Sequence, residues 1–329
     1  MEAARVYASQ SRAPIWRAAG YSGEPSDAAG DSQAPVDLVV VGAASRDVTP
    51  HDPRGWRLGG SATYCSLMAG RMGLRVGCVL GVDAAASDAA ELMLLEEAGV
   101  DVRRILLDRA PVFDNLESNG RRRQRWLSKC SPIPVEALPR EWGAVRGWLL
   151  VPVAGEVRDE WAAAPSGPAA IAVGWQGMLR AFAADGWVRR VAPKPSPLLK
   201  AAGLVSASVD DIPARTALPS LRTLAPAATL VLTAGERGGL VIGPSGMVRY
   251  PAIPAPTVAD PTGAGDVFLA ALVVAWLLHG DRATSRALGL AAAAASCAVE
   301  GVGLTSVPTG NQVAQRLETA GGAVGGQRA

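Results

Sequence analysis

Short apolar runs rich in Val and Leu alternate with longer stretches of helical character along most of this chain. The run Val36–Val41 has the length and β-branched composition of a buried strand. The elements expected after it are, in order, a helix over Ser61–Met72, a strand over Arg75–Leu80, a helix over Ser87–Ala98 and a strand over Val102–Leu107. This order predicts an α/β fold with a mostly parallel central sheet covered by helices.

The alternation changes between Pro111 and Pro134, where two segments of alternating pattern flank Ser118-Asn119-Gly120. Asn-Gly is typical of a tight β-hairpin turn. We therefore expect a small β-hairpin lid over about residues 111–130. Beyond it the pattern predicts further elements: strands over Gly147–Val151, Ala169–Val173, Leu204–Ala207 and Thr229–Thr233, a Gly-rich hairpin over Gly235–Tyr250, and helices over Val267–Leu278 and Arg286–Val299.

The two ends of the chain lack apolar periodicity. Residues 1–35 are rich in Ala, Ser, Gly and Pro without the continuous apolar core of a signal peptide, which predicts a disordered leader. Residues 36–318 then form one domain, and residues 319–329 are expected to be a flexible tail. Since no apolar run is long enough to span a bilayer, the sequence predicts a cytoplasmic protein with no membrane partner.

Composition excludes several classes of protein. Lys+Arg is 32 and Asp+Glu is 30 among 329 residues, and this near-balance argues against a dedicated nucleic-acid binder. No Gly-Lys dipeptide occurs, so the phosphate loop G-x-x-x-x-G-K-[ST] is absent. The 4 cysteines form no C-x-x-C pair, which leaves a zinc ribbon unsupported. A dehydrogenase is excluded because no strand–G-x-G-x-x-G–helix unit is present.

The most specific chemical signal is Asp-Pro-Thr-Gly-Ala-Gly-Asp at residues 260–266, directly before an apolar helix. Small residues ahead of a helix let its backbone N–H groups approach an anion, and the helix dipole favours negative charge there. Asp266 at the mouth of such an anion hole can take the proton of an attacking hydroxyl. The pattern indicates phosphoryl transfer, where positioning does most of the work. The alternative is a Gly-rich helix start with Asp266 as a simple N-cap.

The segment DPTGAGDVFLAAL at residues 260–272 resembles the C-terminal signature of the PfkB/ribokinase family of carbohydrate kinases. Three other motifs follow the family's order. LGG at 58–60 resembles its Gly-Gly substrate motif, SVDD at 208–211 stands where it has N-x-x-E, and TAGERGG at 233–239 resembles its nucleotide loop. The resemblance covers about residues 36–308. It implies a ribokinase-like three-layer fold and a phosphotransferase with an alcohol group as acceptor.

That resemblance also implies roles for individual residues. Asp266 would be the catalytic base, and the amides of residues 263–266 (Gly263, Ala264, Gly265 and Asp266) would form the anion hole. ATP would be the donor, held by Thr233, Gly235, Gly238 and Ser208. Mg²⁺ would be organised through water by Asp211, and Asp260 is a candidate ligand of a monovalent cation, for which K⁺ is the candidate. The implied substrate-binding residues are Asp47, Gly59, Gly60, Tyr64, Asn115, Gln176 and Arg180.

Two departures from the family pattern leave the substrate open. Tyr64 stands where the family commonly has an Asn that contacts the substrate, and a tyrosine cannot pair bidentately with a diol. Ser208 and Asp211 replace the usual Asn and Glu. Three functions therefore remain: a kinase of a sugar or polyol such as an inositol, a nucleoside kinase on the same fold, and a non-catalytic nucleotide-binding or scaffold protein. Both a monomer and a homodimer are compatible with the sequence.

Overall fold

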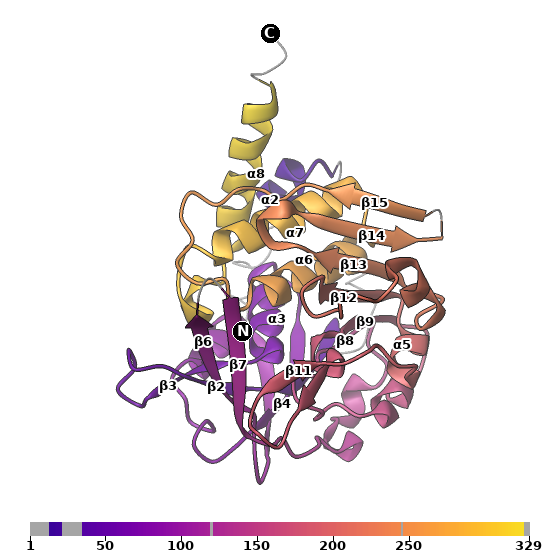
Figure 1. Cartoon of the computed structure of the whole chain (residues 1–329). Coiled ribbons are helices and arrows are strands. Elements are labelled where there is room, and N and C mark those ends of the chain that lie inside the picture. Colours follow the sequence, from indigo (N-terminus) through magenta and orange to yellow (C-terminus); the bar gives the residue numbers. More distant parts are fainter. Residues whose placement is uncertain (1–12, 22–34, 119–120, 245, 326–329) are drawn as a thin grey trace.

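The computed structural model describes residues 13–21, 35–118, 121–244 and 246–325 (Figure 1). Its centre is a nine-stranded sheet in the order β15-β14-β13-β12-β9-β8-β1-β4-β5. Seven strands are parallel: β1 (Leu38–Ala43), β4 (Val76–Val82), β5 (Val100–Leu106), β8 (Gly147–Leu150), β9 (Ala170–Gly174), β12 (Leu204–Ser208) and β13 (Thr229–Thr233). Antiparallel β14 (Gly239–Gly243) and β15 (Gly246–Tyr250) complete one edge.

Strand alternation divides the apolar residues into two cores. Leu38 and Val40 of β1 face one core, and Val39 and Val41 face the other. The first core is covered by α3 (Ser61–Arg71), α4 (Leu92–Glu97), α6 (Ala264–His279), α7 (Ser285–Ala298) and α8 (Gly310–Gly325). The second lies under α5 (Pro197–Ala201) and the 3₁₀ turns Val135–Ala137, Arg140–Trp142, Asp159–Ala163 and Leu218–Thr223. The predicted three-layer α/β fold is confirmed.

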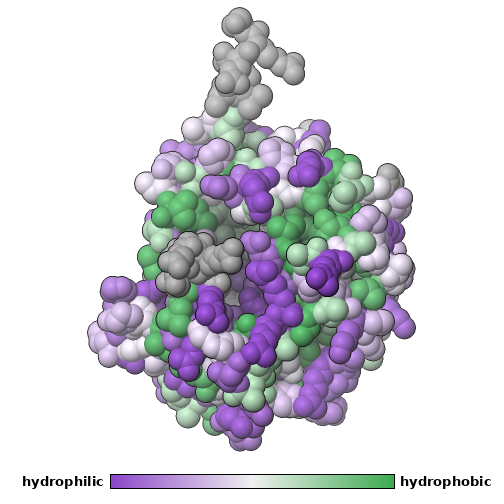
Figure 2. Space-filling view, viewed as in Figure 1, coloured by the Kyte–Doolittle hydropathy of each residue, from purple (hydrophilic) through white to green (hydrophobic). Residues whose placement is uncertain are grey.

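A separate four-stranded sheet, here called the lid sheet, has the order β3-β2-β6-β7. The expected hairpin is present as β6 (Val112–Ser118) and β7 (Arg121–Ser128), while its turn residues Asn119 and Gly120 lie outside the described residues. The other half was not expected from the sequence and consists of β2 (Ser45–Val48) and β3 (Trp56–Gly59). Parallel pairing of β2 with β6 joins the two halves. In Figure 2 the surface beside the lid strands is hollowed, and hydrophilic side chains gather along the hollow.

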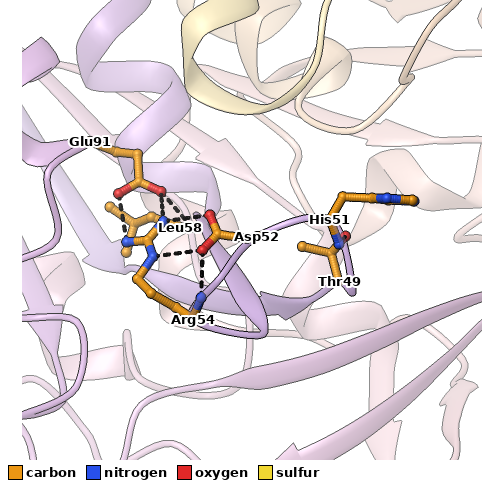
Figure 3. A network of polar contacts seen from close by, with 6 residues as sticks. All are labelled: Thr49, His51, Asp52, Arg54, Leu58 and Glu91. Atoms are coloured by element: carbon orange, nitrogen blue, oxygen red, sulfur yellow. Dashed lines mark hydrogen bonds and ion pairs between the residues drawn. The ribbon is translucent and has the colours of Figure 1, made fainter.

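The turn between β2 and β3 is fastened to the body of the molecule by Arg54 (Figure 3). Its guanidinium donates to both Asp52 in the same turn and Glu91 at the start of α4, with an NH1–Oε2 distance of 2.9 Å to Glu91. Glu91 also accepts from the Leu58 N–H at 3.3 Å. Arg54 stacks over Trp56 at 4.3 Å, so this half of the lid sheet is anchored to α4.

Both chain ends differ from the expectation. The prediction of a disordered leader is wrong for residues 13–21. There α2 (Ala13–Ala18) buries Ile15 and Trp16 in the first core, and the Tyr21 hydroxyl donates to Asp281 at 2.7 Å. The rest of the leader, up to residue 34, lies outside the described residues. The prediction of a flexible tail is wrong up to residue 325, because helix α8 continues to that residue. In Figure 1 this helix projects from the body of the molecule. α8 is retained because Val313 and Ala314 are buried on its inner face.

The helix expected over Ser87–Ala98 is shorter than expected and begins only at Leu92. The preceding residues form turns instead, since the Asp83 carboxylate accepts the N–H of Ala86 at 3.1 Å. Among the described residues, no helix combines the length and hydropathy needed to cross a bilayer.

Candidate active site

The expected site residues come from the carboxyl ends of the parallel strands and from the start of α6. Ser208 ends β12 and pairs in register with Thr233, which ends β13. Gln176 follows β9, and Asp211 follows β12. Because carboxyl ends of parallel strands meet at one edge of the sheet, these residues share that edge.

Asp266 lies in the first turn of α6 and is half-buried. Burial, together with the nearby charges of Asp211 and Asp47, raises the pKa of its carboxyl to about 6. A hydrogen bond with Ser61 and the positive charge of Arg180 oppose that rise. The structure therefore brings Asp47, Asp211, Arg180 and Asp266 close enough to interact. A carboxyl with this pKa is ionised at neutral pH and can accept a proton.

The loop before α6 has the form of an anion hole. Gly263 is the N-cap residue with φ 81°, and no side chain caps the helix, so the simple N-cap role considered for Asp266 is wrong. The Ala264 N–H donates to Pro261 O at 3.3 Å. Within the described residues no hydrogen bond occupies the N–H of Gly265 or Asp266, as expected in a first helical turn. A β-carbon on Gly265 would meet nothing within 4 Å, so its outer side is open to a ligand.

Tyr64 is buried beneath this loop. A β-carbon on Gly263 would fall 2.3 Å from its ring, so the ring supports the loop from α3. Burial raises the pKa of its hydroxyl, and the charges of Asp47, Asp260 and Asp266 add to that rise. The position expected to contact substrate thus shapes the anion hole.

The Gly59-Gly60 pair lies against Asp47 of β2 and against the end of β1. A β-carbon on Gly60, at φ 103°, would fall 2.5 Å from Ala43 O. A β-carbon on Gly59 would fall 2.6 Å from Asp47 Oδ2, so a larger residue there would displace that carboxylate. Ser45 Oγ donates to Asp47 Oδ1 at 3.2 Å. These contacts place a fixed carboxylate beside the start of α3.

Asp211, Gln176 and Arg180 form one cluster. Gln176 Nε2 donates to Asp211 Oδ2 at 3.4 Å, and Arg180 NH2 lies 3.7 Å from Asp211 Oδ1. Within the described residues no group of three His, Cys, Asp or Glu side chains could hold a metal. A single carboxylate fits Mg²⁺, which keeps several waters and binds substrate phosphates. Asp211 is the residue that would hold it.

The expected nucleotide loop closes tightly. The Ala234 N–H donates to Gly238 O at 2.7 Å, and a β-carbon on Gly238 would fall 2.1 Å from Tyr250 O. A cavity of about 150 Å³ adjoins this loop and is lined by Val209, Ala234, Arg237, Gly239, Leu240 and Arg249. A larger cavity of about 410 Å³, lined by residues such as Pro132 and Glu160, contains none of the expected site residues.

The Asp260 carboxylate lies near a positively charged side chain of the protein itself. Its Oδ1 accepts the Thr262 N–H at 2.9 Å, and Arg57 NH1 lies 3.9 Å from its Oδ2. The Arg57 side chain crosses Gly303, where a β-carbon would fall 2.6 Å from Arg57 Cδ. Arg57 was not expected at this site because it belongs to the unexpected strand β3.

Asn115 lies on β6 of the lid sheet, where its Oδ1 accepts from Gln124 Nε2 at 2.9 Å on β7. Its contact with substrate stays a prediction.

Two further residues near the site, Ser61 and Glu156, were not expected from the sequence. The buried Glu156 carboxylate accepts the N–H groups of Ala43, Val153 and Ala154, which joins the end of β1 to the loop after β8. Burial raises the pKa of Glu156. The single signal for it is a charged residue in an apolar stretch, and nothing in the sequence indicates its partners.

Comparison with known proteins shows that part of the chain is similar to a known family. Residues 201–310 match the family model described as pfkB family carbohydrate kinase. The resemblance to the pfkB family is confirmed. A 90-residue segment is 37% identical to a nucleoside kinase of Methanocaldococcus jannaschii, and it covers 27% of this chain and 29% of that relative.

Solved structures of ribokinase-family proteins share the fold over most of the chain. The nucleoside kinase of Methanocaldococcus jannaschii has a TM-score of 0.66 at 17% identity, over 87% of this chain and 99% of that one. A pyrophosphate-dependent kinase complexed with a pyrophosphate analog and myo-inositol has 0.67 at 16%, over 86% and 99%. Arabidopsis thaliana ribokinase complexed with ribose and ATP has 0.61 at 20%, over 86% and 99%. The ribokinase-like fold is therefore confirmed.

Proposed function

We propose that this pfkB-family chain is an ATP-dependent kinase that phosphorylates a hydroxyl of a sugar or polyol. The arrangement at the start of α6 carries the proposal, because an ionisable Asp266 stands beside the open amides of a helix N-terminus. A base for the acceptor hydroxyl and an electrostatic site for the transferring group are thereby combined.

The residues divide the work of phosphoryl transfer. Asp266 takes the proton of the acceptor hydroxyl, whose oxygen then bonds to the terminal phosphorus of the donor. The amides of Gly265 and Asp266 stabilise the negative charge that gathers on the transferring group. Mg²⁺, when bound near Asp211, neutralises part of the phosphate charge. The lid sheet closes over the acceptor and excludes water, which limits hydrolysis of the donor.

A polyol acceptor fits the side chains beside Asp266. Asp47 is a carboxylate that can accept hydrogen bonds from hydroxyl groups, and it packs directly against Gly59 and Ser45. Gln176 adds an amide beside Asp211. The similar structure that contains myo-inositol supports an inositol-like acceptor.

A nucleoside kinase is the second candidate. One observation favours it: the segment that is 37% identical to the nucleoside kinase of Methanocaldococcus jannaschii. A nucleoside presents its ribose hydroxyl groups to Asp47 much as a sugar does, so the two candidates share the chemistry at Asp266.

The test is donor consumption with Mg²⁺ against ribose, fructose, myo-inositol, adenosine and cytidine, with ATP and pyrophosphate as alternative donors. Turnover of one acceptor that is abolished by Asp266→Asn, with ATP binding retained, supports the kinase. Loss of ATP binding in that variant with turnover retained would remove Asp266 from the role of base. A chain that binds ATP without turnover of any acceptor favours the non-catalytic alternative.

A further inference from the structure

The segment after β9 forms a short hairpin at the edge of the sheet that carries the site. Its strands β10 (Arg180–Phe182) and β11 (Val188–Arg190) pair antiparallel. In the sheet order β13-β12-β9-β8-β1, the expected nucleotide loop follows β13, Asp211 follows β12 and Asp47 follows β1. Because the hairpin follows β9, it belongs to the half of this edge that carries Asp47, the side proposed for the acceptor, and not to the half with the nucleotide loop.

One face of this hairpin is turned toward the site. Arg180 NH2 on this face lies 3.7 Å from Asp211 Oδ1. Phe182 stands two residues further along the strand and therefore shares the face, and its ring centroid lies 6.3 Å from that of Phe113 on β6. Phe113 is the register partner of Asp47. The hairpin face thus adjoins both Asp211 and the lid residue beside Asp47.

Arg190 shares this face because it pairs directly with Arg180. The Val191 N–H donates to Leu179 O at 2.9 Å, which makes the next pair, Arg180 with Arg190, a non-hydrogen-bonded pair, in which side chains lie closest. Like charges in such a pair repel each other. The charge of Arg180 is offset by Asp211, whereas within the parts of the chain that the structure describes no hydrogen bond or ion pair engages the exposed Arg190 guanidinium.

The charges of the site explain what a second arginine could do there. Asp47, Asp211 and Asp266 lie close enough for their charges to interact, and Arg180 offsets part of that negative charge. An anionic acceptor would be repelled by these carboxylates unless a further positive group received it. A guanidinium suits that task because its planar fork binds phosphate or carboxylate oxygens in pairs. A neutral polyol would gain nothing from the repulsion between the two arginines.

We propose that Arg190 binds an anionic group, a phosphate or a carboxylate, carried by the acceptor, so that the preferred acceptor is an acidic derivative of a sugar or polyol. This inference rests on the proposed kinase function and names the acceptor class of the same site. Arg190 is then a specificity-determining residue, which holds the anionic group at the hairpin while a hydroxyl group of the same molecule reaches Asp266. Arg180 stays with Asp211.

The first measurement compares matched neutral and anionic acceptors with Mg·ATP and the wild-type chain. The pairs are fructose with fructose 6-phosphate, ribose with ribose 5-phosphate, and glucose with gluconate. In at least one pair we expect kcat/KM of the anionic member to exceed that of the neutral member by about 100-fold, because hydrogen bonds to charged groups are the strong ones. The pair that shows the preference tells a phosphate from a carboxylate.

The second measurement assigns that preference to Arg190. Arg190→Gln should raise the KM of the anionic acceptor by about 10- to 100-fold, with kcat, the KM of ATP and turnover of the neutral member within about twofold. Arg190→Lys should lose less because its charge remains. The control is Arg189→Gln, since Arg189 lies on the opposite face of β11 and pairs with Asp185. The unfolding temperature of Arg190→Gln should not fall, because the substitution removes a repulsion.

Several outcomes would overturn the role of Arg190. Turnover of the neutral members alone contradicts it and leaves the proposed kinase intact. Equal losses for the neutral and the anionic acceptor in Arg190→Gln make its role structural, and a raised KM for ATP with an unchanged acceptor KM assigns it to the donor. A wild-type chain that turns over no member of any pair and no other acceptor contradicts the kinase itself, and the role of Arg190 fails with it.

Discussion

The Tyr64 ring lies directly beneath Gly263, and a β-carbon at position 263 would sit 2.3 Å from it. Tyr64 belongs to α3 and Gly263 is the N-cap residue of α6. This one contact therefore fixes the distance between the anion-hole loop and α3. The same loop requires φ 81° at Gly263, a conformation that side chains disfavour. The contact with Tyr64 and the left-handed conformation of Gly263 together orient the backbone N–H groups of the first turn of α6 toward the site.

The first prediction concerns that cap. Gly263→Ala introduces both backbone strain and a clash with the Tyr64 ring, so it should cost about 2 kcal/mol of unfolding free energy and most of the turnover. Urea denaturation and steady-state kinetics measure the two effects. Truncation of the ring in Tyr64→Ala, combined with Gly263→Ala, should restore part of the stability because the clash is removed.

Gly265→Ala is the matched control, because a β-carbon there meets nothing within 4 Å. It should keep the wild-type unfolding free energy and weaken donor binding, since the new methyl group points into the space left for the phosphates. Equal stability of the variants at positions 263 and 265 would contradict the support that we assign to Tyr64.

The second prediction concerns pH. Because burial raises the pKa of Asp266 to about 6, kcat/KM should fall about tenfold per pH unit below that value as the base becomes protonated. The measurement is a pH profile of kcat/KM in buffers of constant ionic strength. A profile that stays flat down to about pH 5 would show that Asp266 does not act as the base.

The same raised pKa has a consequence for stability. A carboxyl whose pKa is higher in the folded chain favours folding most at low pH, and this advantage is lost as pH rises through about 6. Asp266→Asn should therefore stabilise the chain at neutral pH by about 1 kcal/mol, after allowance for solvent near a half-buried group. At about pH 4 the variant and the wild type should unfold alike, and a gain that is equal at both pH values would exclude this cause.

The fold was largely accessible from the sequence because its strong signals are local. The apolar runs that form β1, β8 and β13 end within a residue or two of their expected bounds, since each strand is buried on both faces. The strands β2 and β3 were missed because a lid sheet is exposed on one side and carries charged residues such as Arg46 and Arg57. Their pairing with β6 depends on a contact far along the chain.

The site divides in the same way. Asp266 and its glycines were found because one contiguous motif contains base, anion hole and helix start. Arg57 and Ser61 were not identified, since only the packed structure brings them to Asp260 and Asp266. The role of Tyr64 could not be inferred, because nothing in the sequence places its ring under a loop about 200 residues later.

The third prediction concerns the buried N-terminal helix. The Trp16 side chain is 1% exposed and lies edge-on to His279 at 4.6 Å. Trp16→Ala should cost about 3 kcal/mol of unfolding free energy and leave kcat unchanged, because α2 is remote from Asp266. Burial lowers the pKa of His279, so the variant should also raise that pKa, as measured by NMR titration. The exposed neighbour Arg17 offers the control Arg17→Ala, and equal stability of the two variants would mean that α2 adds nothing to the core.

The last prediction concerns Arg57 and potassium. The guanidinium 3.9 Å from Asp260 already supplies the positive charge that a monovalent cation would bring to that carboxylate. Replacement of sodium by potassium should therefore change wild-type turnover by less than about twofold, whereas Arg57→Gln should lose activity that potassium restores, because an uncompensated carboxylate attracts the ion. The exposed pair of Arg103 with Asp101 provides the control Arg103→Gln, which should respond to potassium as the wild type does. Strong potassium activation of the wild type would instead mean that Arg57 does not neutralise Asp260 and that this carboxylate binds the ion.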